Sequence, residues 1–338
     1  MRRVRLAALA ALGTAFSCCP GAASAEPADA LVFDAISAPA SVSFEGLVED
    51  VRLGRSGAVV SIYRIEHRAP DATERTFTAP AAERGQELIT RGKDTYAVDP
   101  AARRIVESAN AAADDQVAFD DNYILLRANY RAAVRGSESF DGRQCDVVAL
   151  NNKYTNHTTM LLRIDRQTKL VLEKQQFASD GSMVSEVRFE SVRFEGAPPD
   201  SDFALPAGFV HVAGPSFGVP DDNVTNLIAS AGFSARGPKF LPDGFSPVEG
   251  KVATVKGVRT LHLLYSDGIR TISLFENPSP TGLDMQRFHS EPTTVSGRDA
   301  QYAETGPTTL LTWNDTALHY VLVGDLSLEE LQRIAASI

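Results

Sequence analysis

Short segments of alternating or β-branched residues, separated by turn signals, occupy much of the first two thirds of this chain. Segments of this length and spacing are typical of neighbouring strands in an antiparallel sheet. Residues 54–57 and 179–182 contain the glycines and small polar residues that tight hairpin turns require. The sequence therefore predicts an antiparallel meander. Its expected strands are 41–53, 59–67, 145–150, 160–165, 170–177 and 183–194.

One stretch inside this region has helical spacing instead. Its apolar residues Val117, Ile124, Leu125 and Ala128 recur at intervals that fit one face of a helix better than they fit alternation. We therefore expect a helix within residues 114–128, and we expect it to cross or plug the sheet.

The composition changes at residues 196–222, where five prolines and four glycines fall within 27 positions. Proline cannot donate a hydrogen bond to a sheet ladder, and glycine resists ordering. We expect this stretch to be a linker. It would join a larger domain, residues 26–195, to a smaller domain, residues 223–338.

The smaller domain is predicted to have α+β structure. Asp222 is expected to cap a short helix over residues 224–231. Ser327 and Glu330 have the Ser-x-x-Glu spacing of a capping box, which predicts a helix at the end of the chain. The apolar stripe of that helix, which we expect to pack in the core, is Leu328, Leu331, Ile334 and Ile338. The expected strands of this domain are 260–265, 270–275, 308–313 and 318–323.

The first 25 residues have the pattern of a secretory signal. Three arginines lie within the first five positions, an apolar run occupies residues 6–16, and small residues precede position 26. Cleavage is expected after Ala25, which would place the mature protein in the periplasm. Acylation at Cys18 or Cys19 is a weaker alternative, because the residues before Cys18 match a lipoprotein signal poorly.

The charge of the exported chain disfavours nucleic acid as a partner. The signal contains three of the 33 basic residues and none of the 43 acidic ones, so the mature chain has a net charge of −13. No two histidines have the i, i+3 or i, i+4 spacing of a metal site, and we expect neither a metal nor another cofactor. Cys145 is the one cysteine beyond the signal, and we expect it to be a small buried apolar residue.

One motif has the form of a catalytic site. Residues 214–218, Gly-Pro-Ser-Phe-Gly, match the pattern of a hydrolase nucleophile elbow with Ser216 as the nucleophile. Pro215 and Pro220 bracket that serine inside the expected linker, which does not suit the strand and helix that an elbow needs. The sequence therefore favours binding over catalysis, and an enzyme is not expected.

A curved antiparallel sheet with a helix over its concave side leaves an apolar cleft that suits a lipid-like or peptide ligand. Each candidate for lining such a cleft could equally be an ordinary core residue. These candidates are Phe44, Val48, Ile62, Tyr96, Ile124 and Leu125.

Motifs in both halves of the chain carry a resemblance to one family. They are Ser43-Phe44-Glu45-Gly46, Ile65-Glu66-His67-Arg68, Asn129-Tyr130, Phe140-Asp141-Gly142-Arg143, Leu162-Arg163-Ile164-Asp165, Asp202-Phe203-Ala204-Leu205-Pro206, Leu241-Pro242-Asp243-Gly244-Phe245, Tyr265-Ser266-Asp267-Gly268, Ile272-Ser273-Leu274-Phe275-Glu276 and Val321-Leu322-Val323-Gly324-Asp325. In their order and spacing they resemble the RseB/MucB family of periplasmic regulators of the envelope-stress sigma factor.

The resemblance implies a mainly antiparallel α+β fold. Its larger N-terminal domain would be a half-closed barrel with helices in its mouth, similar to lipoprotein carriers, and its C-terminal domain would be smaller. Residues 26–40 look shorter and less helical than the family's opening helix. Residues 114–121 are unusually acidic for the family.

The resemblance also implies a function. Family members bind the periplasmic part of a membrane anti-sigma factor and shield it from the protease that starts the stress response. Lipid or lipopolysaccharide binding then releases it, as expected when two ligands prefer different states of one protein. The alternative is a periplasmic carrier of lipids or lipoproteins. A homo-oligomer is left open.

Overall fold

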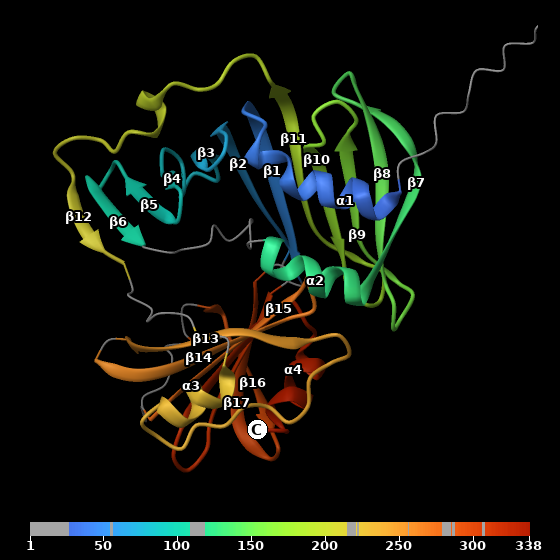
Figure 1. Cartoon of the computed structure of the whole chain (residues 1–338). Coiled ribbons are helices and arrows are strands. Elements are labelled where there is room, and N and C mark those ends of the chain that lie inside the picture. Colours follow the sequence, from blue (N-terminus) through green and yellow to red (C-terminus); the bar gives the residue numbers. More distant parts are fainter. Residues whose placement is uncertain are drawn as a thin grey trace, which may run out of the picture.

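Two separate sheets contain the strands of this protein (Figure 1). The computed structural model describes residues 27–54, 57–108, 119–214, 221, 223–255, 257–278, 285, 288–305 and 308–338. The expected signal peptide, Ser216 and Asp222 therefore lie outside the described residues. The expected α+β class with mainly antiparallel strands is confirmed.

The first sheet has 12 strands, in the spatial order β12-β6-β5-β4-β3-β2-β1-β11-β10-β9-β8-β7. The chain builds one half outward from β1, then crosses to the opposite edge and returns to β1 through β11. Every described pair in this sheet is antiparallel except β12 with β6. The strands are β1 (Phe44–Gly54), β2 (Gly57–Arg68), β3 (Ala72–Ala79), β4 (Glu87–Arg91), β5 (Asp94–Asp99), β6 (Arg104–Ser108), β7 (Tyr130–Phe140), β8 (Arg143–Asn152), β9 (Thr158–Asp165), β10 (Val171–Phe177), β11 (Met183–Arg193) and β12 (Val210–Ala213).

A first helix, α1 (Ala28–Ser37), lies across the β7–β11 half of this sheet (Figure 1). Its residues Leu31, Val32 and Ala35 are buried against apolar side chains of β8 and β9. Residues 28–37 of the segment 26–40 are thus helical. This segment is rich in alanine, a strong helix former, and its buried residues give it one apolar side that the sheet covers.

The helix expected within residues 114–128 is confirmed as α2 (Phe119–Asn129), and residues 114–118 lie outside the described residues. Leu126 of α2 is buried in the same cluster as α1. None of the described helices is long and apolar enough to cross a membrane.

Part of the stretch expected as a linker packs on the first sheet. Phe203, at the end of the short 3-10 helix η2 (Asp200–Phe203), is buried with Ile89, Val98 and Ile105. Farther on, β12 pairs with β6. Prolines did not prevent this packing, because proline is tolerated in extended segments and beside edge strands.

The second sheet has seven strands, in the order β13-β14-β15-β19-β18-β17-β16, all antiparallel to their neighbours. Its elements are α3 (Val224–Ser230), β13 (Ser246–Val255), β14 (Val258–Ser266), β15 (Thr271–Asn277), β16 (Glu291–Val295), β17 (Arg298–Thr305), β18 (Thr308–Asn314), β19 (His319–Gly324) and α4 (Leu328–Ala335).

The capping box predicted for the final helix is confirmed, because Ser327 and Glu330 exchange side-chain and backbone hydrogen bonds at the start of α4. Leu331 and Ile334 are fully buried in the core of the second sheet, as expected from the apolar stripe. The side chain that caps α3 is that of Asn223, whose Oδ1 accepts from the backbone N–H of Asn226 at 3.0 Å.

Candidate functional site

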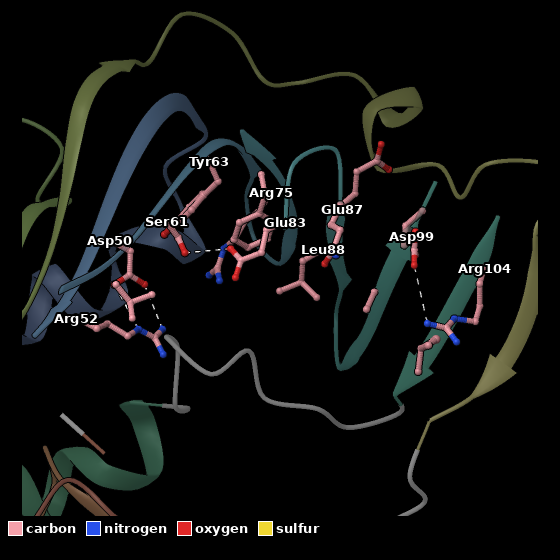
Figure 2. Close-up of a pocket in the computed structure, with 16 residues that line it drawn as sticks. Asp50, Arg52, Ser61, Tyr63, Arg75, Glu83, Glu87, Leu88, Asp99 and Arg104 are labelled. Atoms are coloured by element: carbon pink, nitrogen blue, oxygen red, sulfur yellow. Dashed lines mark hydrogen bonds and ion pairs between the residues drawn. The ribbon is translucent and has the colours of Figure 1, made fainter. Parts of the chain in front are cut away.

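The helix α1 packs over one half of one face of the first sheet, and among the described residues the other half of that face lines a cavity. Following the strand register, the face on which α1 packs over β8 and β9 continues through β1 to Tyr63, Phe77 and Leu88. On these β1–β6 strands the face forms a cavity of about 500 Å³ (Figure 2). The opposite face of the same strands is covered by Phe203.

The floor of this cavity is mainly apolar. Its apolar lining residues come from five strands and include Val59, Tyr63, Phe77, Leu88, Ala97 and Val106. The rings of Tyr63 and Phe77 lie 5.4 Å apart, and the buried guanidinium of Arg75 lies 5.6 Å from the Tyr63 ring centre. The floor can therefore contact the hydrocarbon part of a ligand.

The apolar face extends to the edge of the sheet. Val210 and Val212 of β12 pair with Arg104 and Val106 of β6, so their side chains point to the cavity side. Val210 is 66% exposed and Val212 is 42% exposed. Large apolar side chains left exposed next to a cavity are typical of a binding surface.

Two pairs of opposite charges lie at the rim (Figure 2). Arg52 binds Asp50 at 3.1 Å, and Arg104 approaches Asp99 at 3.9 Å. The hydroxyl of Ser61 donates to Glu83 at 3.0 Å. The cavity thus combines an apolar floor with four carboxylates and three guanidinium groups, an arrangement that suits an amphipathic ligand.

The six residues predicted to line a cleft are not brought together, and none is among the described residues that line this cavity. Phe44 and Val48 point to the cavity side but are buried in the core, where Phe44 packs edge-on against Phe189. Ile62 and Tyr96 lie on the opposite face, across from Glu49 and Ile89 in the ladder. On α2, Ile124 is 76% exposed and Leu125 is half-buried.

Most of the lining residues are not predicted by the sequence, because its pattern indicates no strand between residues 68 and 145. Charged residues interrupt the apolar alternation in β3 and β5, and β4 and β6 are only five residues long. The usable signal was the alternation of Arg75, Phe77 and Thr73 on one side of β3. It is weak because only one of these three side chains is apolar.

Cys145 is fully buried, as expected, and its burial raises the pKa of the thiol to about 11. A thiol with so high a pKa is a poor nucleophile near neutral pH. Among the described residues, no group of three or more His, Cys, Asp or Glu side chains is placed to hold a metal ion.

Two family models match separate parts of the chain. A family described as an uncharacterized protein matches residues 71–196, and a domain of unknown function, DUF4367, matches residues 237–338. No curated protein sequence matches the chain.

Among solved structures, MucB in complex with MucA(peri) matches with a TM-score of 0.62 and 19% identity, covering 92% of this chain and 97% of MucB. The MucA/MucB complex of Pseudomonas aeruginosa gives a TM-score of 0.63 with the same identity and coverage. MucB alone gives 0.55 at 18% identity, covering 92% of this chain and 96% of MucB. The expected resemblance is thus confirmed for the fold: this chain has the two-sheet fold of MucB.

Proposed function

We propose that this protein is a periplasmic regulator that binds the periplasmic segment of a membrane anti-sigma factor, protects that segment from proteolysis, and releases it when a lipid occupies the cavity of the first sheet. The observation that carries this proposal is the match to MucB across both sheets. Two of the matching structures hold MucB together with MucA, so the same fold binds a protein partner there.

The cavity supports the lipid part of the proposal. Transfer of each methylene from water to an apolar surface is worth about 0.8 kcal/mol, so an acyl chain on the floor of Tyr63, Phe77 and Val106 would bind favourably. A ligand shifts the protein between bound and released states only by its difference in affinity for the two. Lipid would therefore release the partner to the extent that it prefers the free protein.

The first 25 residues support the location. They have the arginines, apolar run and small residues of a cleavable signal, so the protein would act outside the inner membrane. Such a location would give the protein access both to a membrane-anchored partner and to envelope lipids.

The test is a pulldown of the protein from Glu26 onward with the periplasmic segment of a single-span anti-sigma protein encoded beside it, with and without lipopolysaccharide. We expect capture without lipid and release with lipid. Absence of capture under both conditions would refute the proposal. Protease digestion of the segment, alone and in the complex, measures the protection.

A substitution in the cavity tests the lipid step. Val106→Glu places a charge on the apolar floor, and we expect it to weaken lipid binding at least about tenfold while partner capture persists, because a buried unpaired charge opposes an acyl chain. Val134→Glu on β7, where Val134 is 43% exposed and does not line the cavity, is the matched control.

A lipid or lipoprotein carrier is the second candidate, because the cavity lies within the first sheet alone. A carrier would move lipid between membranes and needs no partner-binding sheet. Transfer of a labelled lipid between two vesicle populations, without capture of any anti-sigma segment, would favour the carrier over the regulator.

A further inference from the structure

A second cavity, of about 470 Å³, lies between the two sheets. One wall comes from the end of the β1–β2 hairpin and from the β10–β11 hairpin, including Leu53, Phe177 and Asp180. The other wall comes from the second sheet and the start of α4, including Glu304 and Asp325. We refer to this cavity as the inter-sheet cleft.

Among the described residues that line the inter-sheet cleft, carboxylates outnumber guanidinium groups. Its described lining residues include the carboxylates of Asp180, Glu304, Asp325 and Glu330, against the single guanidinium of Arg270. The Nε of Arg270 already donates to Asp267 at 2.9 Å. This excess of acidic side chains among the described lining residues would attract a cationic ligand.

A buried contact between the two sheets, which we call the joint, lies next to this cleft. The side-chain amide of Asn129 donates to the backbone carbonyls of Gly244 and Asp267 at 2.8 and 3.0 Å. The hydroxyl of Tyr130 donates to the carboxylate of Asp267 at 2.7 Å. All three side chains are buried, with Asp267 at 0% exposure, Tyr130 at 2% and Asn129 at 4%. A hydrogen bond to a carboxylate is strong when both groups are buried away from water, so this contact holds the two sheets together.

The joint is tightly packed as well as hydrogen-bonded. A Cβ added at Gly268 would lie 2.2 Å from the backbone nitrogen of Leu126 in α2, so only glycine fits there. Ile269 packs on the cluster formed by α1, β8 and β9. The next residue, Arg270, binds Asp267 in the joint and also lines the inter-sheet cleft. The joint therefore sets the spacing of the two walls before any ligand arrives.

We propose that the inter-sheet cleft binds an extended, positively charged peptide segment of the protein partner, and that the joint holds its two walls ready for that segment. Apolar lining residues such as Phe177, Met183 and Leu326 would take the apolar side chains of the segment, and the four carboxylates would take its Lys or Arg side chains. Because the walls are already placed, little ordering of this protein would be needed on binding.

This inference rests on the proposed function for the identity of the partner, and two probes separate the two ideas. The first probe is the periplasmic segment of the neighbouring anti-sigma protein. The second is a fluorescent decapeptide of alternating arginine and leucine, which requires no knowledge of the partner. Binding of each is measured by fluorescence anisotropy at about 0.1 M salt, where charges interact over roughly 10 Å.

The test variant carries Asp180→Lys and Glu304→Lys, one in each wall. The control carries Glu195→Lys and Asp299→Lys, which change the net charge equally at exposed positions that do not line the inter-sheet cleft. We expect at least a tenfold loss of affinity for both probes in the test variant, less than a threefold loss in the control, and unchanged lipid binding in the first cavity.

Each other outcome has a defined meaning. Equal losses in test and control variants, or no loss in either, would overturn the cleft proposal while the regulator proposal stands. Failure of the anti-sigma segment to bind the wild type, with the decapeptide binding and losing affinity only in the test variant, would support the inter-sheet cleft and refute the regulator. Circular dichroism of each variant checks that it has folded.

Discussion

The two cavities of this protein differ in how their charges and walls are arranged. The first lies within one sheet, has an apolar floor, and is lined by four carboxylates and three guanidinium groups, among which Asp50–Arg52 and Asp99–Arg104 are paired. The second lies between two sheets and has four carboxylates with one guanidinium. The difference indicates ligands of different chemistry: hydrocarbon with a small polar group in the first, and a cationic chain in the second. It also predicts that only the second depends on the joint.

The largest effect is expected from Gly268→Ala, which tests whether only the inter-sheet cleft depends on the joint. The new methyl group would overlap the backbone of Leu126, and Gly268 has a φ of +98°, so we expect the free energy of unfolding to fall by about 3 kcal/mol or more. Urea unfolding measures this change. Binding to the inter-sheet cleft should be lost, whereas lipid binding in the first cavity should persist.

Gly257→Ala provides the matched control for this substitution. Gly257 also has a positive φ, +81°, but a Cβ there would meet nothing within 4 Å, so only the backbone strain of about 1–2 kcal/mol is expected. If both variants lose the same stability, the close approach at the joint contributes nothing and the proposed role of the joint is wrong.

The pH dependence of the free energy of unfolding tests a buried carboxyl group in the second sheet. Glu276 of β15 is fully buried, and burial raises the pKa of its carboxyl to about 7 from an ordinary value of 4.5. Its Oε2 accepts from the backbone N–H of Arg236 at 2.9 Å, and its Oε1 has no hydrogen-bond partner among the described residues. The folded protein therefore keeps a proton there that the unfolded chain loses above pH 4.5.

Because the folded state binds more protons in this window, this contribution to stability is complete below about pH 4.5 and falls as the pH rises to 7. The whole change is about 3 kcal/mol. Urea unfolding at pH 5 and pH 8 should show this loss in the wild type and not in Glu276→Gln. The same slope in both proteins would mean that another group is responsible.

The smallest effect is expected at the rim of the first cavity. Arg104 is more than half exposed and lies 3.9 Å from Asp99, so Arg104→Met should change the free energy of unfolding by less than about 1 kcal/mol. Lipid affinity should change less than about threefold, in contrast to the loss expected from charge reversal in the inter-sheet cleft. A large loss of lipid affinity would show that the rim charges bind the ligand directly.

Much of the fold could be predicted because its strong signals are local. The strand predictions around β1, β2 and β8–β11, the capping box of α4 and the burial of Cys145 all depend on residues close together in the sequence. Alternation and capping chemistry act over two to four residues, so a single sequence reveals them.

The candidate site could not be predicted in the same way because it depends on what packs against each part of the sheet. Alternation along β1 shows which side chains share a face with Phe44. It does not show that α1 packs on one half of that face while, among the described residues, the other half lines a cavity. The joint was missed for a related reason. Tyr130 and Asp267 lie 137 positions apart, and each belongs to a motif that reads as an ordinary turn or strand end.

The positions of β12 and β7 at the two edges of the first sheet determine how the second sheet is attached to it. The strand β12 is one edge of the first sheet, and the chain runs from it to the second sheet, while Tyr130 of the joint opens β7 at the opposite edge. The second sheet thus follows one edge of the first in the chain and is hydrogen-bonded to a strand at the other edge. A ligand that displaces β7 would therefore also disturb the hydrogen bond between Tyr130 and Asp267.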